Sequence, residues 1–310
     1  IMYKKETSPE HGKKNKVTVL APRKINLSLD VTGLDENGYH TLDMIMQSVS
    51  VYEKVTLTKT DSGITISSNA RYIPTDSKNV AVKAAIKFFE FADIQNGGVH
   101  IFVKKTVPIK AGMAGGSADA AAVLVGLNKL YKTNFGITKL CRLAAQVGSD
   151  VPFMIVGGTR RVGGVGDIIS YAPPMPECWF VICMPERGVS TPVAFANYDK
   201  LGKKSDIQTE KLVQALKDKD IYAVARYLGN DLEEAAASPD TRPIKEALMK
   251  HGALGSVMTG SGRAVFGIFD SREKAKSAYE YFRGKVRSAF IAKPVPMGAK
   301  ILPSKERKSY

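Results

Sequence analysis

The sequence has 310 residues, of which 44% are hydrophobic and 24% are charged, and its formal net charge is +15. This composition is typical of a globular protein, and the length suggests about two domains. No apolar run approaches the ~20 residues of a membrane-spanning helix, and the N-terminal segment lacks the apolar core of a signal peptide. We therefore expect a cytoplasmic protein without a membrane partner.

Part of the positive charge lies at the two ends of the chain. Residues 1–16 and residues 300–310 each carry a net charge of +3, which leaves +9 for the remaining residues. No block of basic residues is interleaved with aromatic residues, and no RNA-binding motif occurs. We therefore expect polyanionic small molecules, rather than nucleic acid, as partners.

The cysteines and histidines give no sign of a metal centre or a disulfide framework. Cys141, Cys178 and Cys183 are an odd number of thiols without C-x-x-C spacing, and the four histidines are scattered. Zinc sites need these residue types in clusters with characteristic spacing. The sequence therefore predicts no metal ligated by the protein's own clustered side chains.

Segments of period two and segments of helical period both occur, which predicts an α+β protein. In chain order, the predicted elements are strands at 17–31 (broken near Pro22), 41–60 and 63–68, a helix at 77–92, a strand at 98–112, helices at 115–131 and 137–147, strands at 150–158 and 179–185, helices up to about 251, two strands within 252–269 and a helix at 271–286.

The stretch "APPMPEC" at residues 172–178 is the best candidate for a domain boundary, because it contains three prolines. We therefore expect an N-terminal domain over residues 1–171 and a C-terminal domain over residues 172–310. The first domain is expected to carry a disordered basic tail at the N-terminus, and the second a basic tail at the C-terminus.

A glycine-rich loop leads directly into a predicted helix in "AGMAGGSADAAA", residues 111–122. The first N–H groups of a helix have no partner within it and carry the positive end of its dipole, so this arrangement predicts phosphate binding. Several glycines allow several backbone N–H groups to approach an anion, whereas a tight turn needs only one or two. No Walker A motif can be read through the loop, so other groups must supply the charge and the metal.

Phosphoryl transfer also needs a group that takes the proton of the acceptor hydroxyl, and cations near the developing charge. Asp150, which follows a predicted helix, is a candidate for the carboxylate, the alternative being a solvated or capping aspartate. Lys24 lies in the middle of a predicted strand between apolar residues. An ammonium there needs a partner unless it faces solvent, which is the alternative for this residue.

Motifs at these positions occur in an order that resembles the GHMP small-molecule kinases over about residues 18–270. They are "P-x-K-I-N-L" (22–27), "NGYHTLD" (37–43), "P-x-x-x-G-M-A-G-G-S" (108–117), "GSDVPF" (148–153) and "MTGSG" (258–262). The "GYH" segment and "G-V-S-T-P-x-x-F" (188–195) resemble, more narrowly, the members whose substrate is a cytidyl diphosphate sugar alcohol.

The resemblance implies a two-domain fold with the active site in the cleft between the domains. It implies an enzyme that uses ATP and Mg²⁺ to phosphorylate a hydroxyl of the cytidyl compound, in non-mevalonate isoprenoid precursor biosynthesis. Lys24 and Asp150 match the catalytic pair of the family, in which the carboxylate takes the hydroxyl proton and the ammonium stabilises charge near the γ-phosphoryl. Asn26 would help to position the acceptor.

The resemblance also implies the binding residues. Tyr39 would stack on the cytosine, His40 would hydrogen-bond its edge, Phe195 would cover its other face and Thr191 would contact the substrate through its hydroxyl. The residues that match the ATP-binding positions are Pro108, Gly112, Met113, Ala114, Gly115, Gly116, Ser117 and, near the base, Asn79.

The chain departs from the family pattern at Arg23, Ala118, Arg160, Arg161 and Arg263, which leaves the nucleotide geometry open. Two alternatives therefore stand beside the cytidyl kinase. The first is another GHMP kinase, of the homoserine or mevalonate type, and the second is a catalytically silent relative that binds a nucleotide or RNA. The sequence is compatible with a monomer or a homodimer.

Overall fold

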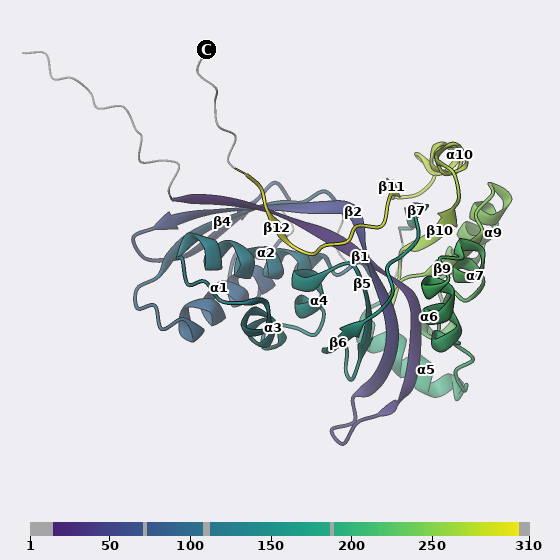
Figure 1. The fold of residues 1–310 in the computed structure, drawn as a ribbon, viewed down its shortest axis with the longest axis horizontal. Coiled ribbons are helices and arrows are strands. Elements are labelled where there is room, and N and C mark those ends of the chain that lie inside the picture. The colour runs from purple at the N-terminus through teal and green to yellow at the C-terminus, as the bar shows by residue number, and fades with distance from the viewer. Residues whose placement is uncertain (1–14, 71–72, 108–111, 187–188, 304–310) are drawn as a thin grey trace, which may run out of the picture.

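The computed structural model describes residues 15–70, 73–107, 112–186 and 189–303. Two β-sheets with helices packed on them form an α+β architecture, as the sequence predicts (Figure 1). Within the described ranges, no helix is both long enough and apolar enough to cross a membrane.

The first sheet is built on two long antiparallel strands, β1 (Lys16–Leu34) and β2 (His40–Thr60). Their register shifts between Pro22 and Arg23, between Asn26 and Ser28, and again after Val31. Because bulges bend a strand pair, the two strands curve away from the rest of the sheet toward the second half of the molecule (Figure 1). The remaining strands of this sheet are β3 (Gly63–Ser68), β4 (Gly98–Lys104), β5 (Thr159–Gly163), β6 (Ile168–Tyr171), β8 (Gly229–Asn230) and β12 (Lys300–Ile301).

Four helices cover one face of the first sheet: α1 (Val80–Phe91), α2 (Gly115–Leu130), α3 (Ile137–Ala145) and α4 (Val151–Val156). Helix α4 corrects the prediction of a strand at residues 150–158. Its apolar run is too short for periodicity to distinguish a strand from a buried helix, and Pro152 suits the first turn of a helix. The helix packs against α2 and β1.

The second sheet has the order β11 (Ser288–Ala292), β7 (Trp179–Met184), β10 (Val265–Phe269) and β9 (Gly255–Met258), and all its pairs are antiparallel. Helices α9 (Thr241–Lys250) and α10 (Arg272–Phe282) pack against it. Its other face shares a buried apolar cluster with β1, in which Ile25 and Leu27 lie with Phe180 and Phe266. The other helices are α5 (Thr191–Leu201), α6 (Thr209–Lys217), α7 (Ile221–Arg226) and α8 (Leu232–Ala235).

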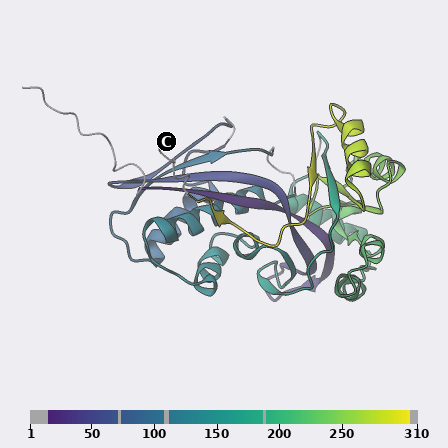
Figure 2. The same cartoon turned by 45° about the horizontal axis from the view of Figure 1, so that its top comes forward.

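The chain crosses between the two sheets more than once. Strand β7 begins directly after the proline-rich stretch, but β8 and β12 return to pair with β1. Figure 2 shows the yellow C-terminal segment running back along the first half of the molecule. The division at residues 171 and 172 therefore stays a prediction about domains, and the two halves are joined by strand pairing as well as by packing.

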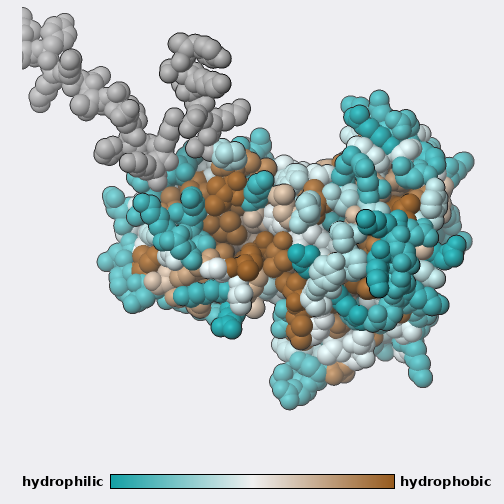
Figure 3. Space-filling model, in the orientation of Figure 1, coloured by the Kyte–Doolittle hydropathy of each residue, from teal (hydrophilic) through white to brown (hydrophobic). Residues whose placement is uncertain are grey.

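The surface differs between the two halves of the molecule. On the face shown in Figure 3, hydrophilic residues cover the C-terminal helices, and hydrophobic residues gather across the middle of the molecule. An apolar groove lined by Ile137, Cys141, Ile169 and Tyr171 lies between α3, α4 and the β5–β6 hairpin.

Candidate functional site

The first glycine loop, residues 112–117, ends in an open helix terminus. Ala114 has a left-handed φ of 51°, and α2 begins at Gly115 without a side-chain cap. The first hydrogen bond within the helix runs from the Ala118 N–H to the Ala114 carbonyl, at 2.9 Å. The N–H groups at the start of α2 therefore have no partner inside the helix, which makes this end suitable for an anion.

Two other predicted ATP-binding residues, Met113 and Asn79, have side chains with structural contacts. The Met113 side chain is buried in the apolar cluster shared with the second sheet, so only its backbone can face a nucleotide. Asn79 caps α1: its Oδ1 accepts from the Ala81 N–H at 2.9 Å, and its Nδ2 donates to the Pro74 carbonyl at 2.7 Å. Its contact with the base stays a prediction, and Pro108 lies outside the described residues.

A second glycine loop, residues 259–262, lies against the first. Gly112 has a φ of 72°, and a Cβ there would overlap the Thr259 carbonyl oxygen. A Cβ at Gly260 would lie 2.9 Å from the Gly112 carbonyl oxygen. Only glycine permits this backbone approach at both positions, so the two loops, far apart in sequence, form one wall of the site.

The Asn230 side chain hydrogen-bonds to the backbone at the second glycine loop. Its Nδ2 donates to the carbonyls of Met258 and Gly260, both at 2.8 Å, and its Oδ1 accepts from the Leu232 N–H. The Ser261 hydroxyl lies 2.7 Å from the hydroxyl of Thr191, a predicted substrate contact. Asn230 is not predicted from the sequence, because no motif around it indicates a hydrogen bond to Gly260, which lies 30 residues further along the chain.

Lys24 and Asn26 lie together, as their spacing predicts. The buried Lys24 Nζ donates to the Asn26 Oδ1 at 2.7 Å, which gives the ammonium a polar partner. Thr259 then ties this pair to the second glycine loop, since its Oγ1 accepts from the Asn26 N–H at 2.9 Å. Thr259 is a further residue that the sequence analysis missed.

Asp150 is the residue before α4, and its side chain makes no hydrogen bond that caps the helix. In the part of the chain that the structure describes, no hydrogen bond or ion pair joins Asp150 to Lys24. The structure does bring the two elements together, because α4 packs on β1, which carries Lys24. Their joint action is therefore still a prediction about the complex with substrates.

His40 and Phe195, both predicted to contact the base, contact each other. Their ring centroids are 4.6 Å apart with planes at 25°, and the His40 Nε2 lies 2.7 Å from the Asp199 Oδ1. Thr191, Phe195 and Asp199 are spaced by four residues along α5 and so share one of its faces. That spacing could have pointed to Asp199. Tyr39, which precedes His40 in the chain, is 67% exposed.

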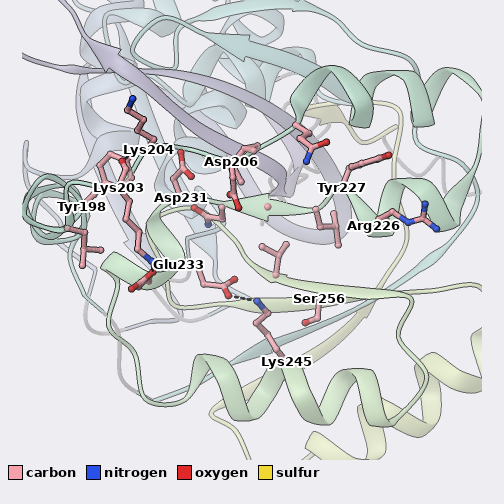
Figure 4. Close-up of a pocket in the computed structure, with 18 residues that line it drawn as sticks. Tyr198, Lys203, Lys204, Asp206, Arg226, Tyr227, Asp231, Glu233, Lys245 and Ser256 are labelled. Carbon is pink, nitrogen blue, oxygen red and sulfur yellow. Dashed lines mark hydrogen bonds and ion pairs between the residues drawn. The ribbon is translucent and has the colours of Figure 1, made fainter.

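Two hollows lie near these aromatic residues. A groove of about 450 Å³ is lined by His40, Asp199 and Lys204. The neighbouring cavity, of about 530 Å³, contains none of the predicted catalytic or binding residues. Figure 4 shows that charged side chains line it, with Lys245 joined to Glu233. We place the candidate site at the glycine loops and the groove, because Asn26 and Thr191 hydrogen-bond to the second glycine loop and His40 lines the groove.

The arginines that depart from the family pattern have structural partners. Arg161 donates to both carboxylate oxygens of Asp43 at 2.8 Å, and the hydrogen bonds to Asp43 raise the pKa of the guanidinium. Arg263 donates to the carbonyl of Glu186, and burial lowers the pKa of Arg263. Arg23 is buried against a carboxylate of β2. These three arginines therefore connect neighbouring loops and strands through hydrogen bonds and ion pairs.

The chain is similar to kinases along most of its length. Residues 79–158 match the GHMP kinases N-terminal domain family, and residues 212–287 match the GHMP kinases C-terminal family. It is 41% identical over 267 residues to 4-diphosphocytidyl-2-C-methyl-D-erythritol kinase of Clostridium perfringens, covering 85% of this chain and 92% of that protein. With the Clostridium novyi protein of the same name, identity is 38% over 274 residues, covering 88% and 98% of the two chains.

Solved structures agree with this result. A crystal structure of 4-(cytidine 5'-diphospho)-2C-methyl-D-erythritol kinase has 31% identity and a TM-score of 0.76, covering 89% of this chain and 98% of that one. Homoserine kinase from Cytophaga hutchinsonii also has a TM-score of 0.76, at 20% identity, covering 97% of this chain and 100% of that one. At that identity the second likeness shows the fold alone.

Proposed function

The chain belongs to the GHMP kinase family, and from this premise we propose that it phosphorylates the 2-hydroxyl of 4-diphosphocytidyl-2-C-methyl-D-erythritol with ATP. The product would serve non-mevalonate isoprenoid precursor biosynthesis in the cytoplasm. The partners are small polyanions, in line with the basic body of the protein, and not nucleic acid or membrane. We expect a monomer or a homodimer.

One observation favours this substrate over those of other GHMP kinases. His40 and Phe195 form an aromatic wall, and Asp199 orients the histidine. Such a wall suits a nucleobase, which can stack on one ring and hydrogen-bond another. Homoserine and mevalonate have no base, so they would leave these groups without a role.

The phosphates of ATP would bind at the N-terminus of α2, where free N–H groups and the helix dipole favour negative charge. Among the residues described, no group of three or more His, Cys, Asp or Glu side chains is placed to hold a metal ion. Mg²⁺ usually retains several waters and binds through the nucleotide phosphates with few protein ligands. The Ser117 hydroxyl, in the first turn of α2, would be one such ligand. Bound Mg²⁺ would neutralise charge on the phosphates.

In the proposed reaction, the substrate hydroxyl oxygen attacks the γ-phosphorus while the bond to ADP breaks. Asp150 takes the proton that the hydroxyl loses. Lys24, held by Asn26, stabilises negative charge on the transferring group, and the N–H groups of α2 orient it. The second glycine loop keeps Asn26 in place through Thr259.

Product analysis tests the proposal. The protein is incubated with ATP, Mg²⁺ and the cytidyl substrate, and mass spectrometry follows ADP and a singly phosphorylated product. Asp150→Asn is the matched inactive control. A protein that binds ADP but forms no phosphorylated product from any acceptor would favour the catalytically silent relative. Steep, salt-dependent RNA binding would strengthen that alternative.

A further inference from the structure

We propose that four charged residues with buried side chains, Arg23, Glu53, Lys105 and Asp119, form a brace that fixes the first turn of α2 against the phosphates of the nucleotide. Arg23 is its central positioning residue. We call these four residues the charge brace. The inference rests on the proposed function, since it concerns the nucleotide site of the kinase.

The charge brace connects four elements of the first half of the chain. Arg23 of β1 is 2% exposed and donates to Glu53 of β2, which is fully buried. Lys105, directly after β4, lies 3.8 Å from the Glu53 Oε2 and pairs with Asp119 of α2. Two cations and two carboxylates therefore balance one another beneath the first glycine loop.

The charge brace contacts the backbone ahead of that loop and within it. The Arg23 Nη2 donates to the carbonyl of Val107, five residues before Gly112, at 3.4 Å. Within the loop, at the first residue of α2, the guanidinium lies so close to Gly115 that a Cβ there would overlap it. The Lys105 Nζ also donates to the Gly115 carbonyl at 3.4 Å. These contacts fix the backbone whose N–H groups we expect to bind phosphate.

The energetics of the charge brace favour a positioning role over a purely stabilising one. Buried ion pairs often add little stability compared with apolar packing, because the charges lose their hydration. Within the described ranges, the Arg23 Nε, Glu53 Oε2 and Asp119 Oδ1 atoms are buried without a hydrogen-bond partner. Such an arrangement does not maximise the stability of the protein. It does hold the backbone at Val107 and Gly115 in place through several charged contacts.

The test uses Gly115→Ala, Arg23→Ala and the double variant, with steady-state kinetics for both substrates. We expect each single variant to raise KM for ATP about tenfold or more, because misplacing a binding group by about 1 Å is costly. KM for the cytidyl substrate should stay within about twofold. The double variant should resemble Arg23→Ala alone, because the added Cβ then meets no guanidinium.

Two further variants separate positioning from charge and from folding. Arg23→Lys keeps the charge but cannot reach both Val107 and Gly115, so its KM for ATP should remain raised. Gly136→Ala is the matched control, because a Cβ there meets nothing within 4 Å. If Arg23→Ala does not fold, Arg23→Lys carries the test.

Three outcomes are decisive. The inference is overturned if Gly115→Ala and Arg23→Ala keep KM for ATP within about twofold of the wild type. It is also overturned if Arg23→Lys has the KM for ATP of the wild type. Failure of the proposed function looks different, because the wild-type protein itself would then give no turnover. In that case, calorimetric titration with ADP replaces KM, and weaker ADP binding by Arg23→Lys and Gly115→Ala supports the charge brace, whereas unchanged binding refutes it.

Discussion

His40 of β2 and Phe195 of α5 stack on each other, with their ring centroids 4.6 Å apart and their planes at 25°. The two residues lie far apart in sequence, and the bend of the β1–β2 pair brings them together. Asp199, one turn further along α5, fixes the histidine through a 2.7 Å contact. Only the face that each ring turns to the other is covered, and Tyr39 is 67% exposed, so we expect Tyr39 to stack on an entering base beside this wall.

Replacing Tyr39 with alanine tests this arrangement. The side chain is 67% exposed, so its removal should not change the stability of the protein. Stacking of a base on an aromatic side chain contributes about 1–3 kcal/mol, so KM for the cytidyl substrate should rise by about 5-fold to 150-fold. KM for ATP should not change. Tyr222→Ala, at another exposed tyrosine, is the control, and an unchanged KM for the cytidyl substrate would rule out stacking.

Asp150→Asn tests the assignment of the general base. The amide keeps the size of the side chain but cannot take a proton, so kcat should fall by ~10²–10⁴. Circular dichroism and ADP binding should remain as in the wild type. A loss smaller than about threefold in kcat would remove Asp150 from this role.

Asn230→Ala tests the support of the second glycine loop. The variant leaves two buried carbonyls, of Met258 and Gly260, without their donors. We expect the free energy of unfolding to fall by about 1–3 kcal/mol, measured by urea denaturation. Gln214→Ala, which removes an exposed side-chain hydrogen bond, should change it by less than about 0.5 kcal/mol. Equal effects of the two variants would contradict the assignment.

The pH dependence of stability should report on Asp119. The pKa of Asp119 is raised from 3.8 to about 6, mainly by burial; Lys105 and Arg23 oppose the rise, and the Glu53 carboxylate adds to it. The folded protein therefore binds this proton more tightly than the unfolded chain does. Stability due to Asp119 is fully present below pH 3.8 and decreases as the pH rises to about 6, by about 3 kcal/mol.

Asp119→Asn cannot titrate and should lack this decrease. The variant should therefore gain stability relative to the wild type, by about 3 kcal/mol, between about pH 4 and about pH 7. Urea unfolding of both proteins across this range measures the difference in their free energies of unfolding. The carboxylates that the two proteins share contribute equally to both and cancel in this difference. A difference that does not depend on pH would show that Asp119 does not titrate as described.

Much of the fold follows from local patterns. Period-two strands, the helix after the glycine-rich loop and the amphipathic helix α10 were all predicted, because each has a long and unambiguous periodicity. Helix α4 was not, since six apolar residues fit either a strand or a helix. The capping role of Asn79 could have been predicted, because an asparagine directly before an apolar helix is a common N-cap.

The site was predictable where a motif carries it and not where it depends on distant contacts. Lys24 and Asn26 lie together because alternate residues of a strand share a face. The pairing of Arg23 with Glu53 could not be predicted, because charged residues in a strand normally indicate solvent exposure. The contacts of Asn230 and Thr259 exist only once the two halves of the chain have packed together.

The measurement that tests the central claim most directly is ADP release from ATP and Mg²⁺ with three separate acceptors. These are 4-diphosphocytidyl-2-C-methyl-D-erythritol, homoserine and mevalonate. We predict turnover with the cytidyl compound alone. Turnover with homoserine or mevalonate, and none with the cytidyl compound, would contradict the assignment of the base-binding wall at His40 and Phe195.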